Sequence, residues 1–474
     1  MNRNAVLVLT VAGLFATNAS AQDAALRAEA EKALKRAIQF FRQDVASHGG
    51  YLWRYSDDLK LREGEGKATT TQVWVQPPGT PSVGLAFLAA HEATGEAAYL
   101  DAAREAAAAL VKGQLRSGGW TYSIEFDPAL RKKIPYRIDG GAAGRNYTTL
   151  DDDTTQEALR LLMRVDQALG FKDAPIHEAA EVALTALLKA QYPNGAWPQG
   201  FDRFPDPEKY PVKKASFPDP WPRKSEFKDY WQHYTLNDNC LADTLDVMFL
   251  ASRIYNEPKY RAAAERAGGF LLLAQLPEPQ PAWAQQYDVN MHPAWARKFE
   301  PPAVTGGESQ GAIKALVALY RETGDRKYLE PIPAALAYLK KSLLPDGRLA
   351  RFYELKTNKP LYFTRAYQLT EQDDDLPTHY GFKVASNLGP LEAEYERVKA
   401  LDPKALKKQP GKPKATDELT AQTKAVIAAL DDRGRWVEDG ALRSAPNGPK
   451  RIISCQTFCK NVAVLTAYLA ASRP

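Results

Sequence analysis

Cysteine is scarce in this sequence, which has only Cys240, Cys455 and Cys459 among its 474 residues. So few cysteines exclude a small fold held together by several disulfides. Cys455 and Cys459 lie four residues apart on one face of an expected helix, where a bridge would strain the regular backbone. We therefore expect three buried, free thiols.

Other absences narrow the function classes. The six histidines show neither H-x-x-x-H nor H-E-x-x-H spacing, which argues against a zinc site of those types. The net charge is only +5, and no basic block resembles a nucleic-acid footprint. After residue 21, no apolar run is long enough to span a membrane. We therefore expect neither nucleic acid nor a membrane among the partners. A monomer is expected as well, although none of these absences determines the oligomeric state.

The first 21 residues differ from the rest. Arg3 precedes an apolar run over residues 5–16, and Ala19-Ser20-Ala21 fits the small-residue pattern of a cleavage site. This combination predicts a secretory signal peptide over residues 1–21. The mature protein is then expected to start near Gln22 and to be secreted or periplasmic.

A short turn marked by glycine or aromatic residues recurs six times, each time after a helical segment rich in leucine or alanine. The turns occupy residues 49–53, 118–120, 195–197, 281–283, 347–351 and 434–436. From Trp53 to Trp120 is 67 residues, and the later steps are of similar length. Repetition at such a period predicts helical hairpins that share one core.

We therefore predict an all-α protein, an α/α toroid or incomplete α/α barrel of about six hairpin repeats with long rim loops. The expected helices cover 23–46, two stretches within 82–115, 154–169, 176–191, 239–255, 258–275, 308–323, 327–344, 416–432 and 454–471. Because a toroid gathers its turns at one rim, residues far apart in the sequence meet there.

Residues 22–474 are expected to be a single domain with two loop insertions. Residues 202–230 are rich in proline and aromatic residues, which favours an ordered loop that covers something. Residues 403–416 are rich in lysine and proline and are expected to be a solvated surface excursion.

Three consecutive carboxylates, Asp151, Asp152 and Asp153, directly precede an expected helix. One of them could cap the helix, but three adjacent negative charges repel each other unless a cation is near. Asp238 follows Asn237 at the equivalent place of the next unit. Oxygen ligands of this kind suit a hard cation such as calcium. Capping and metal binding both remain open from these residues alone.

Arginines follow the repeat turns of the next units, at Arg297, Arg351 and Arg365. A single loop arginine is usually exposed to solvent, whereas three at one rim would form a fork-shaped site for carboxylates. Between them, an expected helix start at 305–309 carries Glu308.

Motifs in chain order over residues 149–365 resemble family 10 pectate lyases. Residues 194–199 (Asn-Gly-Ala-Trp-Pro-Gln) are similar to the family's G-G-W-P-Q, 149–155 to T-I-D-N-D-A-T, 235–239 to T-F-N-D-N, 282–288 to A-W-C-A-Q-H-D, 296–300 to A-R-A-Y-E, 305–309 to S-G-S-E-S and 350–360 to A-R-F-Y-E with T-N-R-P. Each motif is weak alone, but the ordered set is fairly specific. Asp152 replaces the family's Asn, and Ala196 replaces its second Gly.

The resemblance implies an α/α toroid that cleaves polygalacturonate by calcium-assisted β-elimination. Arg297 would be the base that removes the proton at C5. Calcium would be held by Asp151, Asp153 and Asp238. The acidic polysaccharide would be contacted by Arg351, Arg365, Trp197 and Glu308.

Two other functions stay open. A toroid that binds polysaccharide without cleaving it would use the turn tryptophans to stack on sugars. A class II terpene cyclase-like enzyme is less favoured. Residues 114–120 and 191–197 fit the Q-x-x-x-G-x-W pattern, and 150–154 are close to D-x-D-D-T, but such cyclases normally have two toroids and no export signal.

Overall fold

The computed structural model describes residues 11–224, 228–402, 406 and 414–473, and for residues 11–22 it describes only the backbone. Within this part, no helix is both long and apolar enough to cross a membrane. The predicted excursion at 403–416 and the start of the predicted signal peptide lie largely outside the described residues.

The helices form antiparallel hairpins, in agreement with the predicted repeats. Each hairpin contributes one helix to each of two rows. The first row consists of α14 (Cys455–Ala471), α2 (Thr80–Thr94), α5 (Thr154–Ala168), α7 (Cys240–Tyr255) and α9 (Gly306–Thr323). The second row consists of α13 (Asp417–Ala428), α3 (Ala97–Gly113), α6 (Ala174–Ala190), α8 (Pro258–Ala274) and α10 (Ile332–Lys341). Each helix of the first row packs against its neighbours in that row and against its own hairpin partner.

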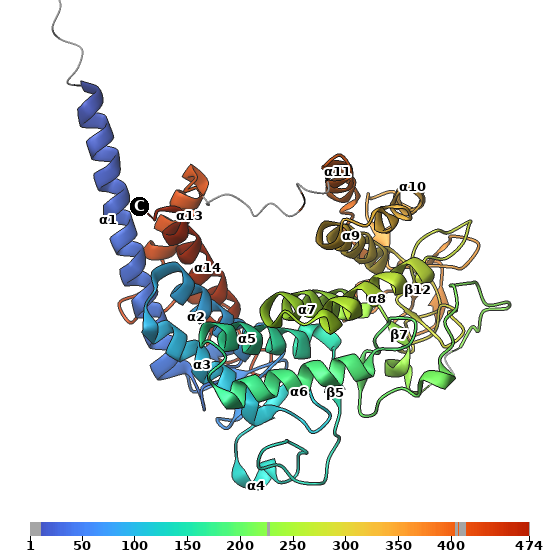
Figure 1. Ribbon diagram of the computed structural model, residues 1–474, viewed down its shortest axis with the longest axis horizontal. Coiled ribbons are helices and arrows are strands. Elements are labelled where there is room, and N and C mark those ends of the chain that lie inside the picture. Colours follow the sequence, from blue (N-terminus) through green and yellow to red (C-terminus); the bar gives the residue numbers. More distant parts are fainter. Residues whose placement is uncertain (1–10, 225–227, 403–405, 407–413, 474) are drawn as a thin grey trace, which may run out of the picture.

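The rows follow an arc, with α13 near one end and α11 (Leu388–Lys399) at the other (Figure 1). The predicted α/α toroid, in its incomplete form, is thereby confirmed. Helix α1 (Val11–Phe40), which continues into the π-helical turn η1 (Phe41–Val45), packs against α13 and α14. The first unit is therefore completed by the last helices of the chain.

Short strands, which the all-α prediction did not include, lie at one end of the hairpins. One set precedes the helices of the first row, either directly or through a short turn: β3 (Gln72–Trp74), β5 (Thr148–Thr149), β7 (Tyr234–Thr235), β9 (Val304–Thr305) and β16 (Arg451–Ser454). Their antiparallel partners are β4 (Ser123–Glu125), β6 (Gly200–Phe201), β8 (Gln286–Tyr287), β11 (Phe352–Tyr353) and β1 (Arg54–Ser56). The strands fix a common rim, where all five helices of the first row begin.

Further strands extend this rim into two four-stranded sheets, ordered β15-β16-β1-β2 and β13-β12-β11-β9, and one additional pair, β10-β14. Their bounds are β2 (Arg62–Glu63), β10 (Leu349–Ala350), β12 (Pro360–Phe363), β13 (Leu369–Thr370), β14 (Lys383–Val384) and β15 (Val437–Asp439). The sheet around β12 carries a small separate core that includes Trp295, Phe299 and Phe363.

The turn tryptophans are parts of the core. Trp120, Trp197 and Trp283 are fully buried, and each indole Nε1 donates to a backbone carbonyl at the end of the preceding helix, at 2.8 to 2.9 Å. Such a buried aromatic residue needs a partner for its N–H group. In these three units the turn is therefore a packing device that closes the hairpin, whereas Trp53 of the first turn is only half-buried.

The glutamines of the Q-x-x-x-G-x-W pattern have an equally structural use. Gln114 Nε2 donates to the carbonyls of Gly118 in its own turn and Ala179 in α6, at 2.7 and 2.8 Å. Gln191 does the same with Gly195 and Ala263, at 2.9 Å each. Each glutamine thus ties its turn to the next unit of the toroid. This removes the main support for a cyclase, since the pattern is explained without any role in chemistry.

The predicted free thiols are present: Cys240 and Cys455 are buried and Cys459 is half-buried. The loop at 202–230, which was predicted to cover another part of the molecule, makes such contacts in its described residues. It reaches the following units through Arg223, whose Nη1 lies 2.7 Å from Glu354 Oε1, and through Pro222, whose carbonyl accepts from Trp295 Nε1 at 2.7 Å.

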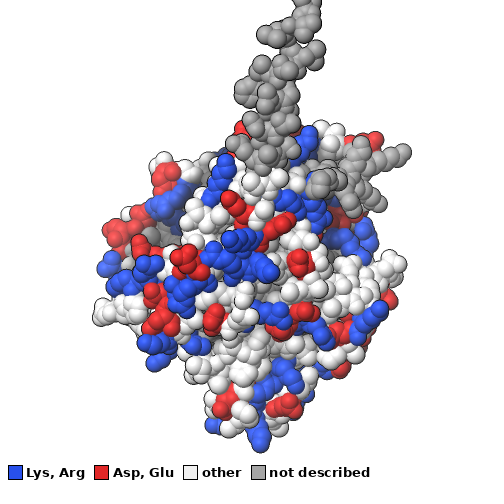
Figure 2. All heavy atoms as spheres, turned by 90° about the vertical axis from the view of Figure 1, so that its left-hand side faces the viewer, with Lys and Arg blue, Asp and Glu red and all other residues white. Residues whose placement is uncertain are grey.

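Charges of both signs are interspersed on the face seen from the α1 side of the molecule (Figure 2). Among the described residues on this face, no extended area carries a single sign. This agrees with the small net charge of the chain.

Candidate active site

Two neighbouring rim turns carry the acidic residues. Strand β5 runs through Leu150 into residues 151–153 before α5 begins, and β7 runs through Leu236 into residues 237–239 before α7 begins. In both turns two consecutive residues adopt the left-handed conformation, with φ of 48° and 58° at Asp152 and Asp153, and 47° and 59° at Asp238 and Asn239. Asp and Asn tolerate this conformation better than other non-glycine residues. Because the two turns have the same conformation, Asp152 in the first turn is equivalent to Asp238 in the second.

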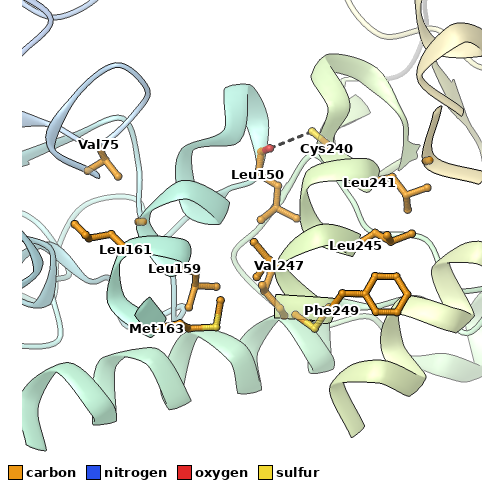
Figure 3. Packing of buried hydrophobic residues seen from close by; sticks show 14 of the residues in the cluster. Val75, Leu150, Leu159, Leu161, Met163, Cys240, Leu241, Leu245, Val247 and Phe249 are labelled. Carbon is orange, nitrogen blue, oxygen red and sulfur yellow. Dashed lines mark hydrogen bonds between the residues drawn. The ribbon is translucent and has the colours of Figure 1, made fainter. Parts of the chain in front are cut away.

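The two turns bring three carboxylates together. One oxygen each of Asp151, Asp152 and Asp238 lies within 4.8 Å of the others. Beneath them, Cys240 at the start of α7 donates its thiol to the carbonyl of Leu150 at 3.2 Å, in the buried layer shown in Figure 3. The cluster is therefore held on the packed junction of α5 and α7.

Uncharged donors orient the three carboxylates. Tyr122 donates its hydroxyl to Asp151 Oδ2 at 3.0 Å, and Gln76 donates Nε2 to Asp152 Oδ2 at 2.7 Å. Asn237 Nδ2 donates to Asp238 Oδ2 at 2.5 Å. Asp151 Oδ1 is buried and has no hydrogen-bond partner among the described residues. An orphaned buried carboxylate oxygen is costly unless something positive meets it, and oxygen-only donors of this kind suit a hard cation such as calcium.

Burial and the closeness of like charges both raise pKa values within the cluster. Burial, followed by the charges of Asp151 and Asp152, raises the pKa of Asp238 to about 7. Burial and the neighbouring Asp151 also raise the pKa of Asp152. Both carboxylates would become easier to ionise beside a bound cation.

Asp153, predicted as a calcium ligand, lies outside this cluster. Its two carboxylate oxygens accept from Arg160 Nη1 at 2.6 and 2.7 Å. The left-handed turn points neighbouring side chains in different directions, so Asp152 occupies the position expected of Asp153. Asp153 also makes no side-chain capping hydrogen bond to α5, although it is the N-cap residue. Helix capping therefore does not account for the acidic turn.

Arg297 is held as a cation by Glu300. Its Nη2 lies 2.6 Å from Glu300 Oε1, and its backbone N–H donates to Glu300 Oε2 at 2.9 Å. Burial would lower the pKa of Arg297, but the hydrogen bond and the charge of Glu300 outweigh it, and the pKa is raised. Asp238 contributes to the same rise, so Arg297 lies within electrostatic reach of the acidic cluster.

Arg351 and Glu308 join the same site. Arg351 Nε donates to the carbonyl of Gly381 at 2.7 Å, and Arg351 Nη1 lies 4.0 Å from Glu308 Oε1. Glu308 Oε2 is buried without a hydrogen-bond partner among the described residues. Asp238 acts electrostatically on both Arg351 and Arg297, while Glu308 acts on Asp238. The structure therefore brings Arg297, Arg351 and Glu308 together with the acids.

Two tyrosines of the site were missed by the sequence analysis. Tyr380 donates its hydroxyl to Glu300 Oε1 at 2.8 Å, and its ring centroid lies 5.3 Å from the guanidinium carbon of Arg297 and 4.6 Å from that of Arg351. Tyr230 is half-buried, and its pKa is raised by burial and lowered in part by Arg297. Neither tyrosine belongs to a repeat turn, so nothing in the pattern singled it out.

Two predicted substrate contacts are placed elsewhere. Trp197 is 0% exposed and donates its indole N–H to Leu187, so its ring is unavailable to a sugar. Arg365 is exposed and pairs with Asp375, with 3.4 Å between Nε and Oδ1. No interaction links Arg365 to the acids or arginines above within the described residues. Both predictions are corrected: the first by core packing, the second by the position of the loop after β12.

The middle of the chain, residues 133–349, matches the family model described as pectic acid lyase. This stretch contains both acidic turns, Arg297 and Glu308. The resemblance to pectate lyases is thereby confirmed for this part of the chain, and it supports a polysaccharide lyase.

Solved structures with a similar fold include a family 10 polysaccharide lyase from Cellvibrio cellulosa, at 20% identity and a TM-score of 0.45, covering 68% of this chain and 98% of that chain. A mutant family 10 lyase from the same organism, in complex with trigalacturonic acid, shows 18% identity, a TM-score of 0.46 and the same coverage. A cellobiose 2-epimerase from Bacillus thermoamylovorans shows 13% identity and a TM-score of 0.48, covering 94% of this chain and 98% of that chain. No curated protein matches the chain.

Proposed function

With the pectic acid lyase match as premise, we propose that this protein is a secreted pectate lyase that cleaves polygalacturonate by calcium-assisted β-elimination. The observation that carries the proposal is the meeting, at one rim, of an oxygen-only acidic cluster with two guanidinium groups. Asp151, Asp152 and Asp238 are the residues that would hold calcium. When bound, calcium neutralises a uronate carboxylate and so favours the negative charge that develops after loss of the C5 proton.

Arg351 is the group proposed to bind a uronate carboxylate directly. It is anchored by Gly381 and lies over Tyr380, which leaves its position fixed before substrate arrives. A guanidinium matches a carboxylate with two parallel hydrogen bonds. Glu308, whose Oε2 is buried and has no hydrogen-bond partner among the described residues, is proposed to accept from a sugar hydroxyl and thereby orient the ring.

Arg297 is proposed as the base at C5. It would take the C5 proton, the C5–H electron pair would form the C4=C5 double bond, and the C4–O bond would break, with water protonating the leaving oxygen. Because Glu300 raises the pKa of Arg297, the neutral base is rare at pH 7. The reaction therefore depends on strong stabilisation of the charge at the uronate carboxylate.

The test is ultraviolet absorbance of the unsaturated uronide during incubation with polygalacturonate, in calcium and in excess chelator. We expect a calcium-dependent rise that is abolished in Arg297→Ala, while Arg433→Ala, which removes an exposed arginine from another unit, behaves as wild type. A flat trace with the wild-type protein, under conditions where it binds the polymer, would contradict the lyase and favour the non-catalytic binding toroid.

A further inference from the structure

A cavity of about 470 Å³ opens beside the acidic cluster, and its volume is typical of sites for small ligands. Its walls come from β4, from the loop between α4 (Pro128–Arg131) and β5, and from the turn η4 (Tyr230–Gln232). Asp151 belongs to both the cavity and the cluster. None of the pectate lyase motifs includes the loop between α4 and β5.

The cavity presents a cation without an anionic partner. Arg145 lines it and is exposed, and no ion pair involves this side chain among the described residues. Its guanidinium carbon lies 3.9 Å from the ring centroid of Tyr147 and 5.0 Å from that of Trp231. Stacking on two rings orients the planar guanidinium and leaves its N–H groups free for a carboxylate.

The rings beneath Arg145 form an aromatic corner. Tyr147 and Trp231 meet edge to face, with centroids 6.4 Å apart and an angle of 85° between the rings. Trp231 is fixed through its backbone, because its carbonyl accepts from the N–H of Gln199 at 3.0 Å. Unlike the buried turn tryptophans, Trp231 is only half-buried and lines the cavity. It can therefore contact a sugar ring, which Trp197 cannot.

Tyr230 connects this cavity with the reaction centre. It lines the cavity. The pKa of its hydroxyl is raised by burial and is also influenced by the charges of Arg297, Glu300, Asp151 and Arg145. Together with Asp151, which belongs to both the cavity and the acidic cluster, Tyr230 makes the cavity adjacent to the reaction centre.

We propose that this cavity is a further uronate subsite, in which Arg145 binds the carboxylate of a neighbouring sugar and Trp231 contacts its ring. The inference rests on the proposed function, because it presumes a uronan at the adjacent site. Arg145 is then a specificity-determining residue that lengthens the recognised stretch of polymer and selects against residues lacking the carboxylate.

The experiment compares trigalacturonate with hexagalacturonate as substrates in calcium, using wild type, Arg145→Ala, Arg145→Lys and the control Arg433→Ala. For hexagalacturonate we expect kcat/KM to fall about tenfold in Arg145→Ala, the loss of one charge-assisted contact, with a smaller fall in Arg145→Lys. Trigalacturonate can bind productively in a register that leaves this subsite empty, so its kcat/KM should fall less than twofold. The products of hexagalacturonate should also change in size. Equal kcat/KM ratios for both substrates and an unchanged product pattern would overturn the subsite.

Calorimetric binding of hexagalacturonate separates the two proposals. It is measured in Arg297→Ala protein with and without Arg145→Ala. If the wild type cleaves no substrate but Arg145→Ala still weakens binding about tenfold, the subsite stands and the lyase proposal fails. If the wild type cleaves the polymer and Arg145→Ala changes neither binding nor cleavage, the lyase stands and the subsite fails.

Discussion

Asp152 and Asp153 are adjacent in the sequence but have different surroundings. Asp152 shares the acidic cluster, whereas Asp153 is neutralised by Arg160. Asp152→Asn should therefore weaken calcium binding at least tenfold, because it removes a ligand charge from the site. Asp153→Asn removes the same charge one residue away and should change the affinity less than threefold.

Titration calorimetry with calcium chloride at constant ionic strength measures both affinities. Because the two variants have the same net charge, any difference between them comes from the position of the carboxylate. Equal weakening in both variants would mean that the cluster is not the calcium site.

The pairing of Arg297 with Glu300 sets the pH dependence of the proposed lyase. A base must be neutral to accept a proton, and the pKa of Arg297 is raised above its ordinary value. Below that pKa, each unit of pH increases the neutral fraction tenfold. We therefore expect kcat/KM for polygalacturonate to keep rising from pH 7 to pH 10, measured at saturating calcium. A bell-shaped profile centred near pH 7 would assign the base to a group that ionises near neutrality.

Within the helices, α5 carries an ionisable group that opposes stability at high pH. Glu157 accepts from Ser82 Oγ at 2.8 Å, and burial raises its pKa to about 7 from an ordinary value of 4.5. The folded state therefore binds this proton more tightly than the unfolded state. The protonated Glu157 contributes fully to the free energy of unfolding below pH 4.5. This contribution of about 3 kcal/mol is lost as the pH rises through 7.

Glu157→Gln removes this titration and keeps the hydrogen bond from Ser82. We expect its Tm to exceed that of wild type by about 3 °C at pH 8 and to equal it near pH 5. Glu29→Gln, which changes an exposed residue of α1, should leave Tm unaltered at both pH values. Thermal unfolding followed by circular dichroism gives the Tm of each of the three proteins at both pH values. A Tm difference for Glu157→Gln that is the same at both pH values would contradict the account.

The turn after α6 provides a test of the structural use of the tryptophans. Trp197→Phe removes the hydrogen bond to Leu187 and leaves a small cavity, so the free energy of unfolding should fall by about 1 to 3 kcal/mol. Because the ring is fully buried, affinity for hexagalacturonate should be unchanged in the folded variant. Denaturant unfolding and calorimetric binding provide the two readings. A large loss of affinity without loss of stability would mean that Trp197 contacts the substrate after all.

For the molecule as a whole, the sequence predicted the helical repeats and their common rim well. Long amphipathic helices with regular turns between them leave a clear pattern. The rim strands were missed because segments such as β5 and β7 have only two residues each, too few to show alternation. Asp153 was predicted from the resemblance, in which Asp152 stands at the family's Asn. The bend from β5 into α5 depends on two left-handed residues, which the sequence does not reveal, and it brings Asp152 into the cluster instead.

The candidate site was predicted in part for a related reason. Arg351 and Glu308 lie in a repeat turn and a helix start, and Arg297 lies in the rim loop that follows a repeat turn. The toroid concentrates functional side chains at this rim. Tyr380 and Arg145 lie in loops whose course depends on tertiary packing, and no periodicity marks them. Trp197 shows the opposite error, since a motif that resembles a functional one serves here to fill the core.

The pairing of β1 with β16 has a consequence for the order in which the molecule assembles. Arg54 lies opposite Ser454 in this ladder. During synthesis, β1 therefore cannot pair with β16 until 400 further residues have been made. At a synthesis rate of about 5 to 20 residues per second, that wait is roughly 20 to 80 s. During this time the first unit lacks the helices that complete it. The ring of the toroid therefore closes at its first unit only after synthesis of the last helix, α14.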